Sequence, residues 1–97
     1  MLAQFENGYF LEVKVIEYSD GEKEYEFNVI SDNDYYIIDS GWTEYRSIEL
    51  YWPLDEIGYI LEYCDSDPGI EILKGNKYEI LKEETFEEYL QKRRIYI

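Results

Sequence analysis

The most regular pattern in the chain is an alternation of apolar and polar residues between Tyr9 and Ile30. In its first half, Leu11, Val13 and Val15 are apolar and the residues between them are polar. The alternation returns after residues 19–21, a Ser-Asp-Gly sequence whose glycine suits the left-handed position of a three-residue hairpin loop. The pattern predicts a long β-hairpin with one apolar face and one water-facing side.

The loop also predicts which residues face each other across the hairpin. If Tyr18 and Glu22 close the loop, the register is fixed, because a shift by one residue would set apolar side chains against polar ones. The apolar pairs predicted in this way are Val15 with Tyr25, Val13 with Phe27 and Leu11 with Val29. The predicted charge pairs are Glu17 with Lys23 and Lys14 with Glu26.

Turn signals on both sides of the hairpin extend it into a meander. Residues 1–8 contain a candidate short strand through Leu2, Ala3 and Phe5, followed by a tight turn at Asn7-Gly8. After the hairpin, residues 31–34 predict a turn into a strand at 35–38, and residues 39–41 predict another turn. The strand expected after that turn carries Ile48, Leu50 and Trp52 at alternate positions.

The last part of the chain predicts short helices and a second hairpin. Pro53 suits the start of a helix with Asp55 and Glu56 in its first turn, and the apolar side of that helix is Ile57, Ile60, Leu61 and Cys64. Residues 65–69 end the helix, and a hairpin of 70–74 with 77–81 is expected around Gly75-Asn76.

Thr85 and Glu88 have the spacing of a capping box, which predicts a final helix. Its apolar residues are Phe86, Tyr89 and Leu90, and its basic end is Lys92, Arg93 and Arg94. Residues 95–97 either dock on the sheet or lie loose. We therefore predict one α+β domain over residues 1–97: an antiparallel meander of four to six strands with one or two short helices packed on one face.

Charge is the most unusual property of the composition. The 97 residues carry a formal net charge of −14 and no histidine. Residues 1–73 hold 18 acids and 3 bases, a net −15, whereas residues 74–97 hold 5 acids and 6 bases, a net +1. Such a field repels nucleic acids and anionic membranes and speeds encounter with basic surfaces. We therefore expect a basic, nucleic-acid-binding protein as partner, and neither direct nucleic-acid nor membrane binding.

Other features of the sequence indicate the compartment. Cys64 is the one cysteine, which excludes an internal disulfide and suits a reducing environment. The N-terminus has no basic and apolar segments of a signal peptide, and no apolar run reaches the length of a membrane helix. We expect a soluble, cytoplasmic protein.

Catalytic chemistry has little support in the sequence. Without histidine, the usual general base, zinc ligand and Ser-His or Cys-His arrangements are missing, and Cys64 on an apolar helix side predicts a buried, inert thiol. Asp65-Ser66-Asp67 begins like a calcium loop, but Ile70 and Asn76 stand where that loop needs Gly and Glu. We predict no enzyme activity, cofactor or metal.

The remaining candidate site is a set of acids interleaved with tyrosines along the meander and the first predicted helix. Tyrosine offers contact area at low entropic cost, and carboxylates bind Arg and Lys, so this mixture is typical of a rigid interface. The alternative is a polar face that only keeps a small protein in solution. The partner-binding residues predicted are Glu22, Glu24, Glu26, Asp32, Asp34, Tyr35, Asp39, Glu44, Asp55, Glu56, Tyr59 and Glu62.

In bulk charge and length the chain resembles small acidic proteins of phages and mobile elements, including anti-CRISPR inhibitors, and bacterial immunity proteins that neutralise nuclease toxins. The resemblance implies an inhibitor that blocks a basic groove by nucleic-acid mimicry, and it carries no residue correspondence. The alternative hypothesis is a structural or self-assembling accessory subunit, a homo-oligomer formed through a sheet edge or through Trp42, Tyr51 and Trp52. A third hypothesis is a carboxylate-dependent hydrolase or a metal-binding protein.

Overall fold

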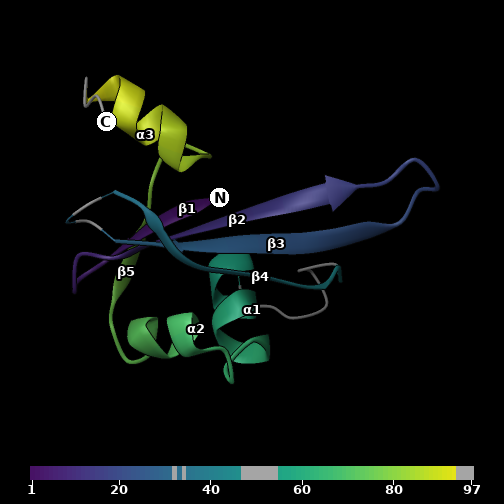
Figure 1. The fold of residues 1–97 in the computed structure, drawn as a ribbon, viewed down its shortest axis with the longest axis horizontal. Helices are drawn as coiled ribbons and strands as arrows, with labels where there is room; N and C mark the ends of the chain where they lie inside the picture. The colour runs from purple at the N-terminus through teal and green to yellow at the C-terminus, as the bar shows by residue number, and fades with distance from the viewer. Residues whose placement is uncertain (32, 34, 47–54, 94–97) are drawn as a thin grey trace.

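An antiparallel sheet with helices on both faces forms the molecule (Figure 1). The computed structural model describes residues 1–31, 33, 35–46 and 55–93. In these residues the sheet has five strands in the order β4-β3-β2-β1-β5. The strands are β1 (Leu2–Phe5), β2 (Phe10–Glu17), β3 (Lys23–Ile30), β4 (Ile37–Glu44) and β5 (Tyr78–Ile80), and the helices are α1 (Glu56–Tyr63), α2 (Pro68–Leu73) and α3 (Phe86–Lys92). The predicted α+β class is confirmed.

The hairpin of β2 and β3 has the register predicted from its loop. Val15 faces Tyr25, Val13 faces Phe27 and Leu11 faces Val29. The loop closes as expected, because the Tyr18 N–H donates to the Glu22 carbonyl over 2.8 Å and Gly21 takes a φ of +87°.

The predicted charge pairs face each other but do not form the ion pairs expected of them. Lys14 stands opposite Glu26 in the register, yet its ammonium lies 3.4 Å from a carboxylate oxygen of Glu12. Lys23 stands opposite Glu17, and its ammonium lies over the Tyr45 ring, 5.4 Å from the centroid.

The main core lies between the apolar face of the hairpin and helices α1 and α2 (Figure 1). Phe27 and Val29 of β3 are buried there with Ile57 and Ile60 of α1. Val15 belongs to the same face but is 41% exposed, because the hairpin extends beyond the helices toward its loop. Burial of this face is the main apolar contribution to stability.

The alternating pattern predicts that the second face of the sheet is exposed to water, but part of this face is buried. Helix α3 covers one end of it, and a second cluster of buried residues forms there: Leu2, Phe10, Ile30, Phe86 and Tyr89. The ring centroid of Phe10 lies 4.9 Å from those of both Phe86 and Tyr89. The two short helices predicted on one face are α1 and α2; α3 packs on the other face in addition, because the even positions at this end of the hairpin carry the large apolar side chains of Phe10 and Ile30.

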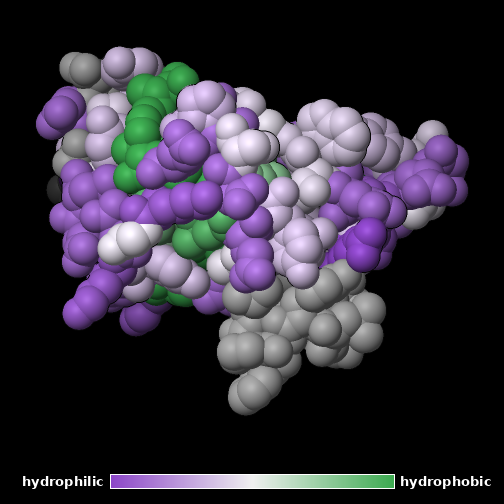
Figure 2. All heavy atoms as spheres, turned by 90° about the horizontal axis from the view of Figure 1, so that it is seen from below, coloured by the Kyte–Doolittle hydropathy of each residue, from purple (hydrophilic) through white to green (hydrophobic). Residues whose placement is uncertain are grey.

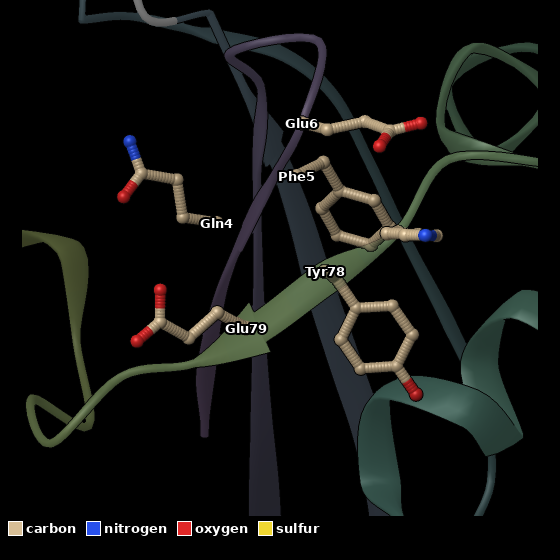
Figure 3. A pocket seen from close by; sticks show the side chains of 6 residues that line it. Gln4, Phe5, Glu6, Tyr78 and Glu79 are labelled. Carbon is tan, nitrogen blue, oxygen red and sulfur yellow. The ribbon is translucent and has the colours of Figure 1, made fainter.

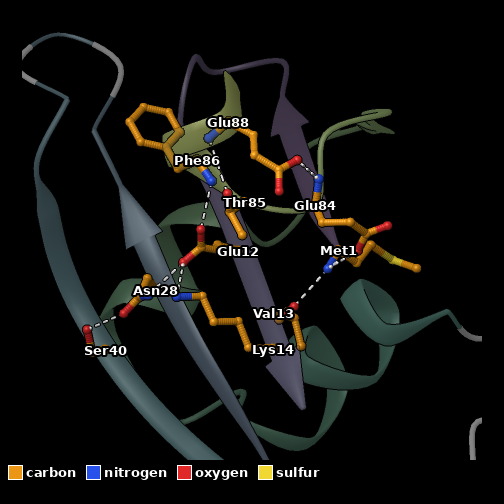
Figure 4. Close-up of polar contacts among 10 residues, drawn as sticks. All are labelled: Met1, Glu12, Val13, Lys14, Asn28, Ser40, Glu84, Thr85, Phe86 and Glu88. Atoms are coloured by element: carbon orange, nitrogen blue, oxygen red, sulfur yellow. Dashed lines mark hydrogen bonds and ion pairs between the residues drawn. The ribbon is translucent and has the colours of Figure 1, made fainter. Parts of the chain in front are cut away.

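Glu12 connects this second layer to the sheet, although the alternation had assigned it to water (Figure 4). The side chain is buried, with 5% exposure. One carboxylate oxygen accepts a 2.7 Å hydrogen bond from the Phe86 amide, in the first turn of α3. The other accepts from the Asn28 amide over 2.9 Å. The carboxylate thus satisfies an amide that the helix itself leaves without a partner.

β1 is the central partner of an early strand and a late one. Its predicted strand character and the turn at Asn7-Gly8 are confirmed, with the Gly8 N–H donating to the Phe5 carbonyl over 2.9 Å. β1 pairs on one side with β2 and on the other with β5.

The predicted second hairpin was half wrong. Residues 70–73 lie in α2, and a strand forms only in the later segment, as β5. Asp67 caps the helix with its side chain and Pro68 occupies the first position, which favours helix over strand. Ile70 and Leu73 then lie three residues apart and are both fully buried.

The predicted turn at residues 39–41 was also wrong, since these residues lie within β4. Gly41 is needed there because a Cβ would come within 2.5 Å of the Phe27 ring. The expected strand carrying Ile48, Leu50 and Trp52 and the expected helix start at Pro53 lie outside the described residues. Asp55 is the N-cap of α1 and Glu56 its first residue.

The cap predicted for α3 is confirmed. The Thr85 hydroxyl oxygen accepts from the Glu88 amide over 3.2 Å, while the Glu88 carboxylate accepts from the Glu84 amide over 3.3 Å. Arg94 and residues 95–97 lie outside the described residues. Among the described ranges, none of the helices has the length and apolar run that crossing a membrane requires.

The buried face of the hairpin predicts a large difference between two substitutions in β3. Phe27→Ala should lower the free energy of unfolding by about 3–5 kcal/mol, because the ring is buried. Glu24→Ala on the opposite face should change it by less than about 0.5 kcal/mol. Urea unfolding measures both, and equal losses would contradict the assignment of the two faces.

The link between Glu12 and α3 predicts a similar contrast. Glu12→Ala should cost about 3 kcal/mol, because it leaves a buried amide without an acceptor. Lys14→Ala removes the exposed partner of the same carboxylate and should cost less than about 1 kcal/mol. Similar losses in thermal unfolding would mean that the carboxylate does not hold α3.

Candidate functional site

Four of the predicted binding residues come together on the uncovered part of the second sheet face and its loop. Glu24 of β3 stands opposite Glu44 of β4, and Glu26 stands opposite Trp42. Facing residues of an antiparallel pair point to the same side of the sheet. We call this surface the acidic strand face and define it as Tyr18, Glu22, Glu24, Glu26, Trp42 and Glu44.

The alternation of β3 positions these acids. Tyr25 and Phe27 point into the core, so Glu24 and Glu26 must point away from it, with their Cα atoms roughly 7 Å apart along the strand. Three hydrogen-bonded strands fix this part of the face, because β3 pairs with both β2 and β4. The carboxylates are therefore held at a defined spacing.

Like charges are set against each other on this face. Glu24 and Glu44 are direct cross-strand neighbours, an arrangement that lowers the stability of a sheet. The Tyr18 hydroxyl donates a hydrogen bond to Glu24, and the pKa of Tyr18 is raised, chiefly by that hydrogen bond. Arg46 lies 3.4 Å from the Glu44 carboxylate. These contacts compensate the repulsion only in part.

Glu26 and Trp42 take less part in side-chain contacts with the rest of the protein than Glu24 and Glu44 do. The Glu26 carboxylate has no hydrogen-bond or ion-pair partner among the described residues, and the Trp42 side chain is 69% exposed. Trp42 adjoins Gly41, whose backbone lies against the Phe27 ring. An exposed indole thus stands on a strand that the core supports from behind.

The acids predicted on the first helix lie on the other side of the sheet and have different roles. The Asp55 carboxylate caps α1 by accepting from the Gly58 amide over 2.7 Å, and it also accepts from the Tyr78 hydroxyl over 3.3 Å. Glu56 is half-buried, and burial raises its pKa. Glu62 is exposed. The predicted surface is therefore divided, and among these three acids Asp55 serves the fold as a helix cap.

The remaining predicted residues do not join either group. Tyr59 is only 2% exposed and donates from its hydroxyl to the Glu44 carbonyl over 3.1 Å, so its assignment to a binding surface was wrong. Tyr35 takes a φ of +53° and packs beside Phe86, with ring centroids 6.0 Å apart. Asp32 and Asp34 lie outside the described residues.

Asp39 forms a pair with Asp67 that sequence reasoning missed. Both carboxylates accept from the Gly69 amide, over 3.1 Å and 3.0 Å respectively, so the pair joins β4 to α2. Burial raises the pKa of Asp67, and its hydrogen bond with Asp39 raises it further. No local signal marks this pair, because the two residues lie far apart in the sequence and Asp39 had been assigned to a turn.

Other features offer less for binding or chemistry. A shallow hollow of about 360 Å³ lies beside β1 and β5, where Figure 3 shows Phe5 and Tyr78 on one side and Gln4 and Glu79 on the other. Phe5 and Tyr78 pack on each other, 5.1 Å between centroids. Cys64 is partly buried, and burial raises the pKa of its thiol. Within the described ranges, no group of three or more acidic or cysteine side chains is arranged to hold a metal ion.

The side of the molecule that carries α1 and α2 is also polar. In Figure 2, hydrophilic residues gather at the hairpin tip, at the right-hand end, and form a band across this side.

Comparison with protein-family models, with curated proteins and with solved structures found no match.

The Asp39–Asp67 pair predicts a pH-dependent effect of one substitution. The pKa of Asp67 is raised in the folded state, so its contribution favours folding below the unfolded pKa and is lost as the pH rises through the folded pKa. Asp67→Asn keeps a good helix cap and removes one of the two charges. The variant should gain stability relative to the wild type as the pH rises from about 4 to 7.

Urea midpoints across this range measure the effect. Asp65→Asn is the control, because Asp65 is exposed and pairs with Lys74 rather than with Asp39. It should show no gain with rising pH. A constant difference between Asp67→Asn and the wild type would contradict the repulsion assigned to the pair.

Proposed function

We propose that this protein is a small acidic binding protein that occludes a basic, nucleic-acid-binding surface of a partner protein. The observation that carries the proposal is the fixed opposition of the half-buried Glu24 and the exposed Glu44, with Glu22 and Glu26 beside it. Nucleic-acid mimicry is the specific form proposed, since carboxylates at regular spacing on a strand can occupy sites that bind a row of phosphates.

The energetics of the acidic strand face favour a cationic partner. Repulsion between Glu24 and Glu44 is present before binding, so a cation placed between them relieves an existing cost while it forms new contacts. Because the carboxylates stand on paired strands, little main-chain ordering is needed on association. The net charge of −14 adds long-range attraction to a basic groove.

The proposal involves binding without catalysis, in the cytoplasm. Three of the most engaged carboxylates are already used by the fold: Glu12 binds the start of α3, Asp55 caps α1, and Asp67 caps α2. Cys64 is a free thiol, which a reducing compartment would preserve. The kinds of partner proposed include nucleases and CRISPR effectors, in keeping with the resemblance to phage and immunity proteins.

A second candidate function is self-assembly through β4. Among the described residues this strand pairs only with β3, and it carries two exposed apolar side chains, Ile37 at 54% and Trp42 at 69%. An exposed terminal strand with apolar residues is a common site of association. Tyr51 and Trp52, which the sequence had grouped with Trp42, lie outside the described residues.

Association kinetics test the binding proposal. The partner is captured from lysate of the host with immobilised protein, and DNA or RNA should displace it. The association rate should fall steeply as salt rises, because ions screen charges beyond about 8–10 Å. Reversal of Glu22, Glu24 and Glu26 to Lys should slow association at low salt by at least about tenfold, with the fold retained, because these side chains lie off the core.

A matched triple variant separates the acidic strand face from bulk charge. Glu6, Glu71 and Glu79 are exposed and lie at other places in the fold, so their reversal to Lys changes the net charge equally. It should slow association much less. Equal effects of the two variants would mean that only bulk charge matters. Salt-independent association that nucleic acid does not compete with would favour self-assembly. A dimer seen by light scattering and disrupted by Trp42→Ala would also favour it.

A further inference from the structure

Two side chains of the acidic strand face, one a carboxylate and one an indole, stand next to each other. Glu26 and Trp42 are direct cross-strand neighbours on the uncovered part of the sheet. The indole is 69% exposed, whereas the Glu26 backbone is fixed by strand pairing on both sides. A carboxylate beside an aromatic ring offers two oxygen atoms for bidentate hydrogen bonds and a surface for stacking.

The structure also explains why Glu26 is available. Its predicted partner, Lys14, is drawn toward the buried Glu12 carboxylate, 3.4 Å away. Of its acidic neighbours, Glu24 accepts a hydrogen bond from the Tyr18 hydroxyl, and Glu44 lies 3.4 Å from Arg46. Among the described residues, Glu26 alone of these three strand acids has no such contact.

Elsewhere in the protein, an arginine side chain contacts both an aromatic ring and a carboxylate. The guanidinium of Arg93 lies over the Tyr89 ring, 3.7 Å from the centroid, and also pairs with a Glu83 oxygen over 3.2 Å. An arginine thus stacks on a ring and binds a carboxylate at the same time. Guanidinium is suited to both contacts because it is planar, weakly hydrated and rich in donors.

We propose that Trp42 and Glu26 form a recognition site for an arginine side chain of the partner protein. The inference rests on the proposed function and makes it more specific: the basic surface is read through arginine, and lysine at the same position is a poorer ligand. A lysine ammonium keeps its charge attraction to the face but lacks the planar group that stacks and donates in a fork. Lys14 lies on the same face, and its ammonium is held toward Glu12.

The test compares oligo-arginine and oligo-lysine peptides of equal length by isothermal titration with the full chain at low salt. The arginine peptide should bind roughly tenfold more tightly, as expected for one stacked, desolvated guanidinium. Trp42→Ala and Glu26→Gln should each remove most of that preference, while Trp42→Phe should retain part of it. Circular dichroism checks that each variant keeps the fold.

Glu22→Gln is the matched control, because it removes one charge from the same face away from the indole. It should weaken both peptides equally and leave the arginine preference intact. A preference that survives Trp42→Ala would overturn the inference. Equal, salt-sensitive binding of both peptides would also overturn it while leaving the proposed function in place, whereas no binding of either would count against both.

Discussion

The hydrogen bond from the Phe86 amide to the buried Glu12 carboxylate is the contact on which the two-sided fold depends. It crosses from the second strand to the last helix and holds α3 over one end of the sheet. The same carboxylate attracts Lys14, which stands opposite Glu26 in the register. A contact that secures the fold thereby leaves a surface carboxylate unpaired, so the stability of the second layer and the chemistry of the acidic strand face are connected.

The acids of this chain fall into two groups with different physical roles. Some accept hydrogen bonds from backbone amides at helix starts, where the helix dipole favours negative charge: Glu12, Asp55 and Asp67. Others, such as Glu24 and Glu44, oppose each other on neighbouring strands, an arrangement that weakens the sheet slightly. The first group therefore stabilises the fold, whereas the second group costs it some stability.

Sequence reasoning succeeded where the determining interactions are local and failed where they are distant. The hairpin register follows from one loop and an alternating pattern, and all of the predicted apolar pairs were found. The position of α3 depends on Phe10 and Ile30 meeting Phe86, and the role of Asp39 depends on Gly69. Neither contact has a local signature, so the burial of Glu12 and Tyr59 was not predictable from their own segments.

The sheet order has a consequence for how the chain folds as it is made. β1 lies between β2, which follows it directly, and β5, which is synthesised after both α1 and α2. The hairpin contacts are short-range and can form early, whereas the pairing of Ala3 with Ile80 must wait for nearly the whole chain. Until then one side of β1 is an unpaired strand edge on the ribosome, and it is closed by β5, the last strand in the part of the chain that the structure describes.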